Sequence, residues 1–298
     1  MKNFGVGLLA VAMTLGPSVR GAGGVVDGFA GQELDVARMD GKSLITLVAS
    51  REAEASNYRG RYMYLSVERS ERTGGHEWTE RVAETAWGKV RYLIAEDGKP
   101  LEGMRLAAER ARIEDEGAHP DEFKRQEAGK MEDEQHARSM MTLLPKAFVF
   151  DPPEVEGDYV RVRYRPNPDY QPSGLEERVL HGMSGSVLID AKMIRTHELD
   201  GRMAQDVNIG FGILATIHAG SNFSTTRDHM EGYDWKTVTV HTDINGKALF
   251  LKTVARKQEA KHTDFKRIPD GITVEEAVKR RSRYQPQAEI HYLRILLR

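Results

Sequence analysis

Alternating apolar and polar residues extend over more than a hundred positions after Pro145, and this pattern constrains the fold more than any other feature of the sequence. Between Val160 and Arg165 every second residue is apolar and the residues between them are arginines, which is typical of a strand with one apolar and one basic face. Residues 209–219 continue the alternation and predict one long amphipathic strand. In the run before it we expect a shared apolar face formed by Val179, Met183, Val187 and Ile189.

Short turn signals separate these predicted strands. They lie at residues 190–192, at residues 231–234 and at Asn245 and Gly246, a pair that favours a two-residue hairpin. Links this short force neighbouring strands to run antiparallel, so the pattern predicts a meander. Strands of this length curl into a barrel or half-barrel more readily than they lie flat. The predicted fold class is therefore mainly antiparallel β with helices (α+β).

The first third of the chain predicts a helix followed by strands. Residues 43–55 place Leu44, Leu47 and Val48 on one helical face, at the spacing of an amphipathic helix that packs on a sheet. Strand-like runs follow at residues 61–69, 79–87 and 89–96, and residues 97–100 (Asp-Gly-Lys-Pro) form a turn.

Residues 101–144 change to a composition dense in Glu, Arg, Lys and Ala and predict an inserted, charged helical hairpin. The hairpin is expected to break at residues 117–120, which include Gly117 and Pro120. Its charges favour a solvated face, with a partner-binding surface as the alternative. The tail at residues 269–298 contains a capping box at Thr273 and Glu276, and predicts either a docked helix or a disordered segment.

Residues 1–22 have the organisation of a cleavable signal peptide. Lys2 is followed by an uncharged apolar run at residues 4–19, which Gly16, Pro17 and Arg20 make too short to span a membrane. We therefore expect a periplasmic or secreted protein. The chain has no cysteine, so neither disulfides nor a cysteine-linked lipid anchor are expected, and no later segment is apolar for long enough to cross a bilayer. The net charge of −2 argues against general nucleic-acid binding.

Catalytic and metal-binding motifs are weak throughout. Residues 182–185 (Gly-Met-Ser-Gly) resemble the nucleophile turn of serine proteases, but Met183 stands where such sites carry Asp, and no G-x-S-x-G occurs. His181, His197, His218 and His241 fall one per predicted strand, and a metal site among them is the alternative to ordinary strand histidines. No H-E-x-x-H and no phosphate loop is present. The sequence predicts no catalytic residues, no metal and no cofactor.

The order of these features resembles the LolA/LolB superfamily of periplasmic lipoprotein carriers and receptors. The local similarity is at residues 185–190 (Gly-Ser-Val-Leu-Ile-Asp), followed by a turn and a strand at residues 193–199. The resemblance implies an unclosed β-barrel covered by helices, enclosing an apolar cavity that takes up acyl chains. The residues expected to line it are Met183, Val187, Ile209, Phe211, Ile213, Ile217, Trp235, Val238, Val240 and Phe250. The long charged hairpin and the tail depart from the family pattern.

The function expected from this resemblance is non-enzymatic binding of acyl chains, lipid or lipoprotein in the cell envelope. The expected organisation is a signal peptide at residues 1–22, one half-barrel domain at residues 23–268 that includes the insertion at 101–144, and a tail at residues 269–298. One alternative is an envelope scaffold or protein-interaction module that uses the charged hairpin. A second alternative is a serine-type hydrolase around Ser184.

Overall fold

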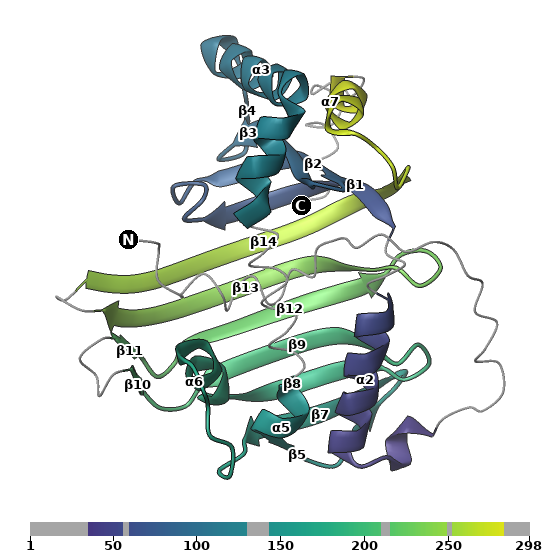
Figure 1. Ribbon diagram of the computed structural model, residues 1–298, viewed down its shortest axis with the longest axis vertical. Coiled ribbons are helices and arrows are strands. Elements are labelled where there is room, and N and C mark those ends of the chain that lie inside the picture. Colours follow the sequence, from purple (N-terminus) through teal and green to yellow (C-terminus); the bar gives the residue numbers. More distant parts are fainter. Residues whose placement is uncertain (1–34, 56–59, 130–142, 210–214, 249–251, 283–298) are drawn as a thin grey trace. The chain divides into compact units, whose positions relative to one another are not determined.

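The computed structural model describes residues 35–55, 60–129, 143–209, 215–248 and 252–282, and these divide into two compact units (Figure 1). Unit 1 combines residues 1–59 with residues 133–257, and unit 2 combines residues 60–132 with residues 258–298. The sequence prediction placed residues 23–268 in one domain and residues 269–298 in a separate tail. The expected signal peptide at residues 1–22 lies outside the described residues.

Unit 1 is an antiparallel sheet with helices on one face. Its strands follow the order β5-β7-β8-β9-β12-β13, with β6 paired to β7, and β11 paired to both β10 and β13. Its elements are η1 (Val36–Arg38), α2 (Gly41–Ala55), α5 (Leu144–Ala147), β5 (Phe148–Phe150), β6 (Glu154–Glu156), β7 (Tyr159–Pro166), α6 (Leu175–His181), β8 (Met183–Asp190), β9 (Arg195–Met203), β10 (Val207–Ile209), β11 (Ala215–Ile217), β12 (Asn222–His229) and β13 (Trp235–Ala248). Strand β14 (Lys252–Ile268) begins in unit 1 and continues into unit 2.

The alternation in β7 is confirmed. Val160, Val162 and Tyr164 are buried on the face that packs with α2, which confirms the helix predicted at residues 43–55. The three arginines of β7 lie on the opposite face and pair with the acidic side chains of Glu156, Glu154 and Asp151. Across the described residues the protein is mainly antiparallel β with helices and its sheet is unclosed, as the sequence predicts.

The single long strand predicted at residues 209–219 is wrong. Two short strands, β10 and β11, pair antiparallel with each other in that region, with Ile209 opposite Ala215. The chain therefore reverses between them. Because paired residues of an antiparallel ladder point to the same face, and both positions are odd-numbered, the odd–even alternation continues through the reversal and imitates one strand.

Two further local predictions are wrong. Asn245 and Gly246 form no turn: they lie inside β13, where Gly246 pairs with Ile217 of β11. A Cβ at Gly246 would lie 2.5 Å from the Thr216 carbonyl oxygen, so glycine here permits the close approach of the two strands. Val179 and His181 belong to α6, so they share no strand face with Met183. The turns predicted at residues 190–192 and 231–234 are confirmed between β8 and β9 and between β12 and β13.

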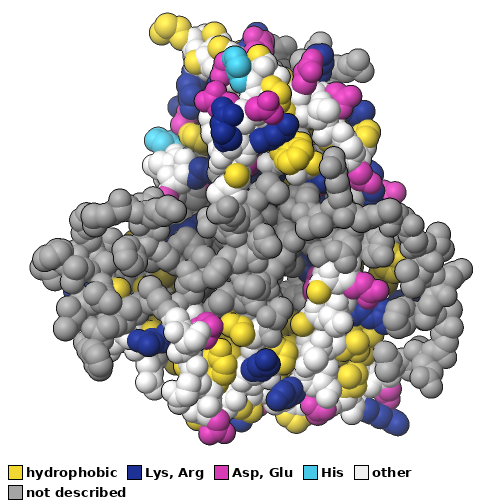
Figure 2. All heavy atoms as spheres, viewed as in Figure 1, with side chains coloured by type: hydrophobic (Ala, Val, Ile, Leu, Met, Phe, Trp, Pro, Cys, Tyr) yellow, Lys and Arg dark blue, Asp and Glu magenta, His cyan; other side chains and the backbone are white. Residues whose placement is uncertain are grey.

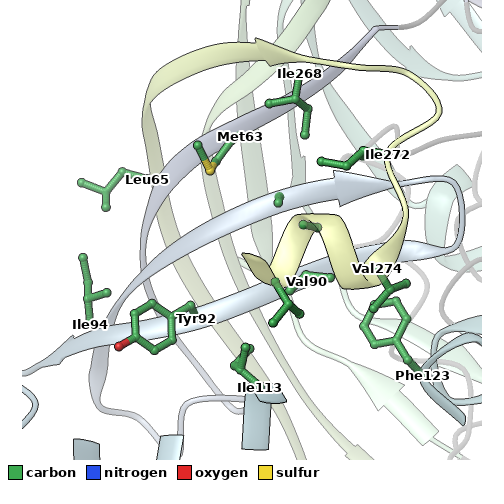
Figure 3. Close-up of a cluster of buried hydrophobic side chains, with 13 residues drawn as sticks. Met63, Leu65, Val90, Tyr92, Ile94, Ile113, Phe123, Ile268, Ile272 and Val274 are labelled. Carbon is green, nitrogen blue, oxygen red and sulfur yellow. The ribbon is translucent and has the colours of Figure 1, made fainter. Parts of the chain in front are cut away.

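Unit 2 is a smaller antiparallel sheet covered by helices. Its strand order is β4-β3-β2-β1-β14, and its elements are β1 (Arg61–Ser70), β2 (Glu77–Thr85), β3 (Gly88–Glu96), β4 (Lys99–Pro100), α3 (Gly103–Ala118), helical residues 120–129, the second part of β14, and α7 (Val274–Ser282). Figure 3 shows the core between them, in which Met63 and Val90 of the strands belong to the same buried cluster as Ile113 of α3 and Val274 of α7. The helix alternative for the tail is thus the one observed as far as residue 282.

Helix α3 and the helical residues 120–129 replace a neighbouring strand along part of β3. Glu109 accepts a hydrogen bond from the Leu93 backbone N–H at 2.9 Å, and Arg112 donates to the Arg91 carbonyl at 2.6 Å. Glu127 accepts from the Lys89 N–H at 3.4 Å. Glu109 is buried, so its charge belongs to an interior contact and not to the solvated face expected for this segment. These side chains satisfy backbone groups that an edge strand otherwise leaves open.

The remainder of the charged segment agrees in part with its prediction. The expected break is observed at His119, between α3 and the helical residues 120–129. Figure 2 shows Lys and Arg side chains interspersed with Asp and Glu side chains around α3 and α7. Residues 130–142 lie outside the described residues, so the return of the predicted hairpin stays a prediction.

Candidate functional site

Helix α2 covers part of the apolar face of unit 1, which it shares with α5 and α6, and defines the candidate site (Figure 1). Its residues Leu44, Ile45 and Val48 recur at helical spacing and are buried against the strands β7 and β8. Val162 and Ile189 on those strands are completely buried. The sheet therefore presents a continuous apolar surface beneath one amphipathic helix.

The last turn of α2 places a carboxylate in this interface. Glu52 Oε2 accepts a hydrogen bond from Arg195 Nη2 at 2.9 Å, and its Oε1 accepts from Arg227 Nη1 at 2.8 Å and from the Thr196 backbone N–H at 3.1 Å. The side chains of Arg195 and Arg227 are only 6% and 4% exposed. We call Glu52, Arg195 and Arg227 the Glu52 cluster; it joins α2 to the adjacent strands β9 and β12.

The electrostatics of the Glu52 cluster favour ionised Glu52. Burial alone raises the pKa of this carboxyl, but the charges of Arg227 and Arg195 and their hydrogen bonds outweigh burial and lower its pKa to about 2. Removing either partner from such a cluster leaves a buried charge uncompensated, which is costly. The cluster thus fixes the C-terminal end of α2 on the sheet.

Backbone and aromatic groups surround the two arginines. Arg195 Nη1 donates to the Tyr233 carbonyl at 2.9 Å, and Arg227 Nη2 donates to the Trp235 carbonyl at 3.3 Å. His197 Nδ1 donates a hydrogen bond to the Arg227 carbonyl at 2.7 Å, so Nδ1 carries the proton. Its ring lies edge-on to the Trp235 ring, with centroids 6.4 Å apart.

The predicted cavity-lining residues fall into several places within unit 1. Met183 and Ile217 share one buried cluster, Val187 belongs to the cluster beneath α2, and Leu199 packs against both. Trp235 and Val240 are buried in β13 and Val238 is half-buried there. The structure describes the backbone of Ile209, in β10, but not its side chain. Phe211, Ile213 and Phe250 lie outside the described residues.

Ser184 is a half-buried residue of β8, paired with Arg202 of β9. None of the described histidines forms a hydrogen bond with its hydroxyl. His181 binds the Asn167 carbonyl, His218 lies 3.3 Å from Asp206, and His241 binds the Asn222 side chain. Within the described ranges there is no group of three or more potential metal-ligating side chains.

A second buried charge cluster lies in unit 2. Arg72 donates to Glu68 at 2.7 Å and to Glu80 at 2.6 and 2.9 Å, and Arg91 donates to Glu80 at 3.1 Å. Burial raises the pKa of Glu68, but the hydrogen bonds and charge of Arg72, the charge of Arg91 and the Ser70 hydroxyl outweigh burial and lower it to about 2. We call these four charged residues the Glu68 cluster.

The sequence prediction missed the Glu52 cluster, although the sequence carries a signal for it. Glu52 follows Val48 by four residues and so belongs to the buried face of the helix. In β12, Phe223 and Thr225 are buried at alternate positions, and Arg227 is the next residue on that face. A charge at a position where the periodicity expects an apolar residue is the signal of a buried ion pair.

Comparisons with protein-family models, with curated proteins and with solved structures find no match for this chain. In the part of the chain that the structure describes, none of the helices combines the length and apolar character needed to cross a membrane.

Proposed function

We propose that unit 1 binds acyl chains of a lipid or lipoprotein, without catalysis, in the cell envelope to which residues 1–22 direct the chain. The observation that carries the proposal is an unclosed antiparallel sheet whose apolar face is covered in part by the amphipathic helix α2. This arrangement supports the resemblance to the LolA/LolB superfamily, in which helices cover an unclosed barrel that takes up acyl chains.

The proposed binding mode replaces one apolar contact by another. An acyl chain takes the place of Leu44 and Val48 of α2 against Val162 and Ile189 of the sheet. The exchange conserves buried apolar area, so the free energy needed to move the helix is offset by burial of the ligand, at about 25 cal/mol per Å².

Photo-crosslinking tests the proposal. The full chain, purified from a Gram-negative envelope, is incubated with a diazirine-labelled fatty acid and digested, and labelled peptides are identified by mass spectrometry. We expect labels on α2 and on β7 to β9, competed by unlabelled fatty acid. The peptides of unit 2 serve as the internal control. Labelling confined to unit 2, or no label combined with no lipid in an organic extract of the purified protein, would overturn the proposal.

A protein-interaction module is the second candidate, and exposed apolar side chains of unit 2 favour it. Met104 on α3 is 91% exposed, and Trp87 is 44% exposed with the Lys124 ammonium 4.8 Å from its ring centroid. Met and aromatic residues are enriched in protein–protein interfaces, which makes Met104 and Trp87 the residues to test for contact with a partner. Met104→Ser together with Trp87→Ser should then abolish envelope pull-downs while fatty-acid labelling persists, and unchanged pull-downs would contradict this candidate.

A further inference from the structure

Three buried N–H donors around the Glu52 cluster lack an acceptor among the residues that the structure describes. They are Arg195 Nε, Arg227 Nε and Trp235 Nε1. The three side chains are each more than nine-tenths buried. Buried donors are nearly always hydrogen-bonded, and each donor left without an acceptor is costly, so three in one region require an explanation.

The three donors belong to one region of the sheet. Arg195 and Arg227 bind the two oxygens of the same carboxylate, so their guanidinium groups flank Glu52. Arg227 also donates to the backbone of Trp235, and β9, β12 and β13 are consecutive strands in the sheet. Each guanidinium thus uses both Nη groups in contacts with the protein and keeps its Nε–H unused.

The Glu52 cluster also carries an excess of positive charge. Two guanidinium groups face one carboxylate in the Glu52 cluster, which leaves one positive charge in excess. An excess buried charge is stabilised by a counter-ion that also accepts hydrogen bonds.

We propose that Arg195, Arg227 and Trp235 form a binding site for a carboxylate ligand, which accepts hydrogen bonds from Arg195 Nε, Arg227 Nε and Trp235 Nε1. A carboxylate carries one negative charge and offers about four acceptor positions, enough for three donors. The ligand lies beside Glu52 and leaves its ion pairs in place. The site goes beyond the proposed function, which concerns an acyl chain and not its headgroup. A small free acid and a fatty acid carry the same carboxylate, so the site does not depend on acyl binding.

Indole NMR of the full chain tests the site directly. The protein labelled with ¹⁵N at its three tryptophans is titrated with acetate at constant ionic strength, and Trp235→Phe assigns the resonance. We expect a saturable downfield shift of the Trp235 indole proton, with the indole of Trp87 unmoved. Calorimetry should show acetate affinity about tenfold lower for Trp235→Phe, which loses one charge-assisted hydrogen bond, and unchanged for the control Trp87→Phe.

Binding of decanoate and decanol shows whether the carboxylate belongs to a fatty acid or to a small free acid. The same comparison tests the carboxylate site and acyl binding separately. Decanoate binding much tighter than acetate, with the same indole shift, places a fatty acid in the site. Equal affinities make the ligand a free small acid and leave acyl binding unsupported. If decanol and decanoate bind alike without moving the Trp235 indole, acyl binding stands and the carboxylate site falls. An indole resonance that no carboxylate moves, in wild-type protein, overturns the site.

Discussion

Glu52 supplies the only carboxylate oxygens that Arg195 and Arg227 are observed to bind among the described residues, so its charge is the first to test. We expect Glu52→Gln to lower the free energy of unfolding of unit 1 by about 3 kcal/mol, because two buried guanidinium groups then lack a counter-charge. Urea denaturation measures the change. Glu54→Gln is the matched control, since Glu54 is exposed on the same helix. Equal stability of the two variants would mean that the ion pairs contribute nothing net.

Individual residues also show where sequence reasoning succeeds and fails. Val162 and Arg163 were assigned correctly to opposite faces, because alternation depends only on strand geometry. Glu52 and Arg227 were missed, because a charged residue on an apolar face is stable only with a partner from a distant segment. The periodicity marks each charge as misplaced on an apolar face, but which distant residue pairs with it depends on tertiary structure.

At the scale of elements, β3 depends on side chains of α3. Glu109→Ala should cost about 2 kcal/mol, because it leaves the buried Leu93 N–H without its acceptor. Hydrogen exchange of the Leu93 amide should accelerate together with the loss of stability. Glu114→Ala, at an exposed position of the same helix, should leave both quantities nearly unchanged. Unaltered exchange at Leu93 in Glu109→Ala would contradict the edge-satisfying role of Glu109.

The start of α7 has its own reciprocal cap. The Thr273 hydroxyl accepts from the Glu276 N–H at 3.1 Å, and Glu276 accepts from the Thr273 N–H at 3.0 Å. Thr273→Ala should therefore destabilise unit 2 by about 1 kcal/mol. Thermal unfolding checks this, with Glu275→Gln as the control, because the exposed pair of Glu275 with Lys279 contributes little. A control as damaging as Thr273→Ala would show that the cap itself adds nothing.

The sequence predicts the boundaries of an element where the residue composition changes at that boundary. It does not predict them where the composition and the alternation continue unchanged. The capping box located α7, and the change to strong helix formers located α3 within a few residues. The reversal between β10 and β11 was missed because Ile209 and Ala215 keep the same parity across it. The turn predicted at Asn245 and Gly246 is wrong because the sequence does not distinguish a glycine that allows close approach of a neighbouring strand from a glycine that forms a turn.

At the scale of the whole molecule, both units contain a glutamate with a lowered pKa, buried in the case of Glu68 and largely buried in the case of Glu52. The pKa of Glu52 in unit 1 and that of Glu68 in unit 2 each fall from an ordinary value of 4.5 to about 2. A carboxyl whose folded pKa is below its unfolded pKa contributes stability that is present above the unfolded value. That contribution is lost as the pH falls towards the folded value, because the unfolded state then binds the proton first.

Acid should therefore weaken each unit between about pH 5 and pH 2, with a slope near 1.4 kcal/mol per pH unit for each glutamate. Urea denaturation at a series of pH values measures the slope, with segment-resolved hydrogen exchange assigning it to unit 1 or unit 2. Glu52→Gln should flatten the dependence in unit 1 and leave unit 2 unchanged, and Glu68→Gln should do the reverse. Because both carboxylates are largely shielded from solvent and paired with arginines, 1 M salt should reduce these slopes only slightly. A slope that persists in unit 1 of Glu52→Gln would assign its acid sensitivity to other carboxyl groups.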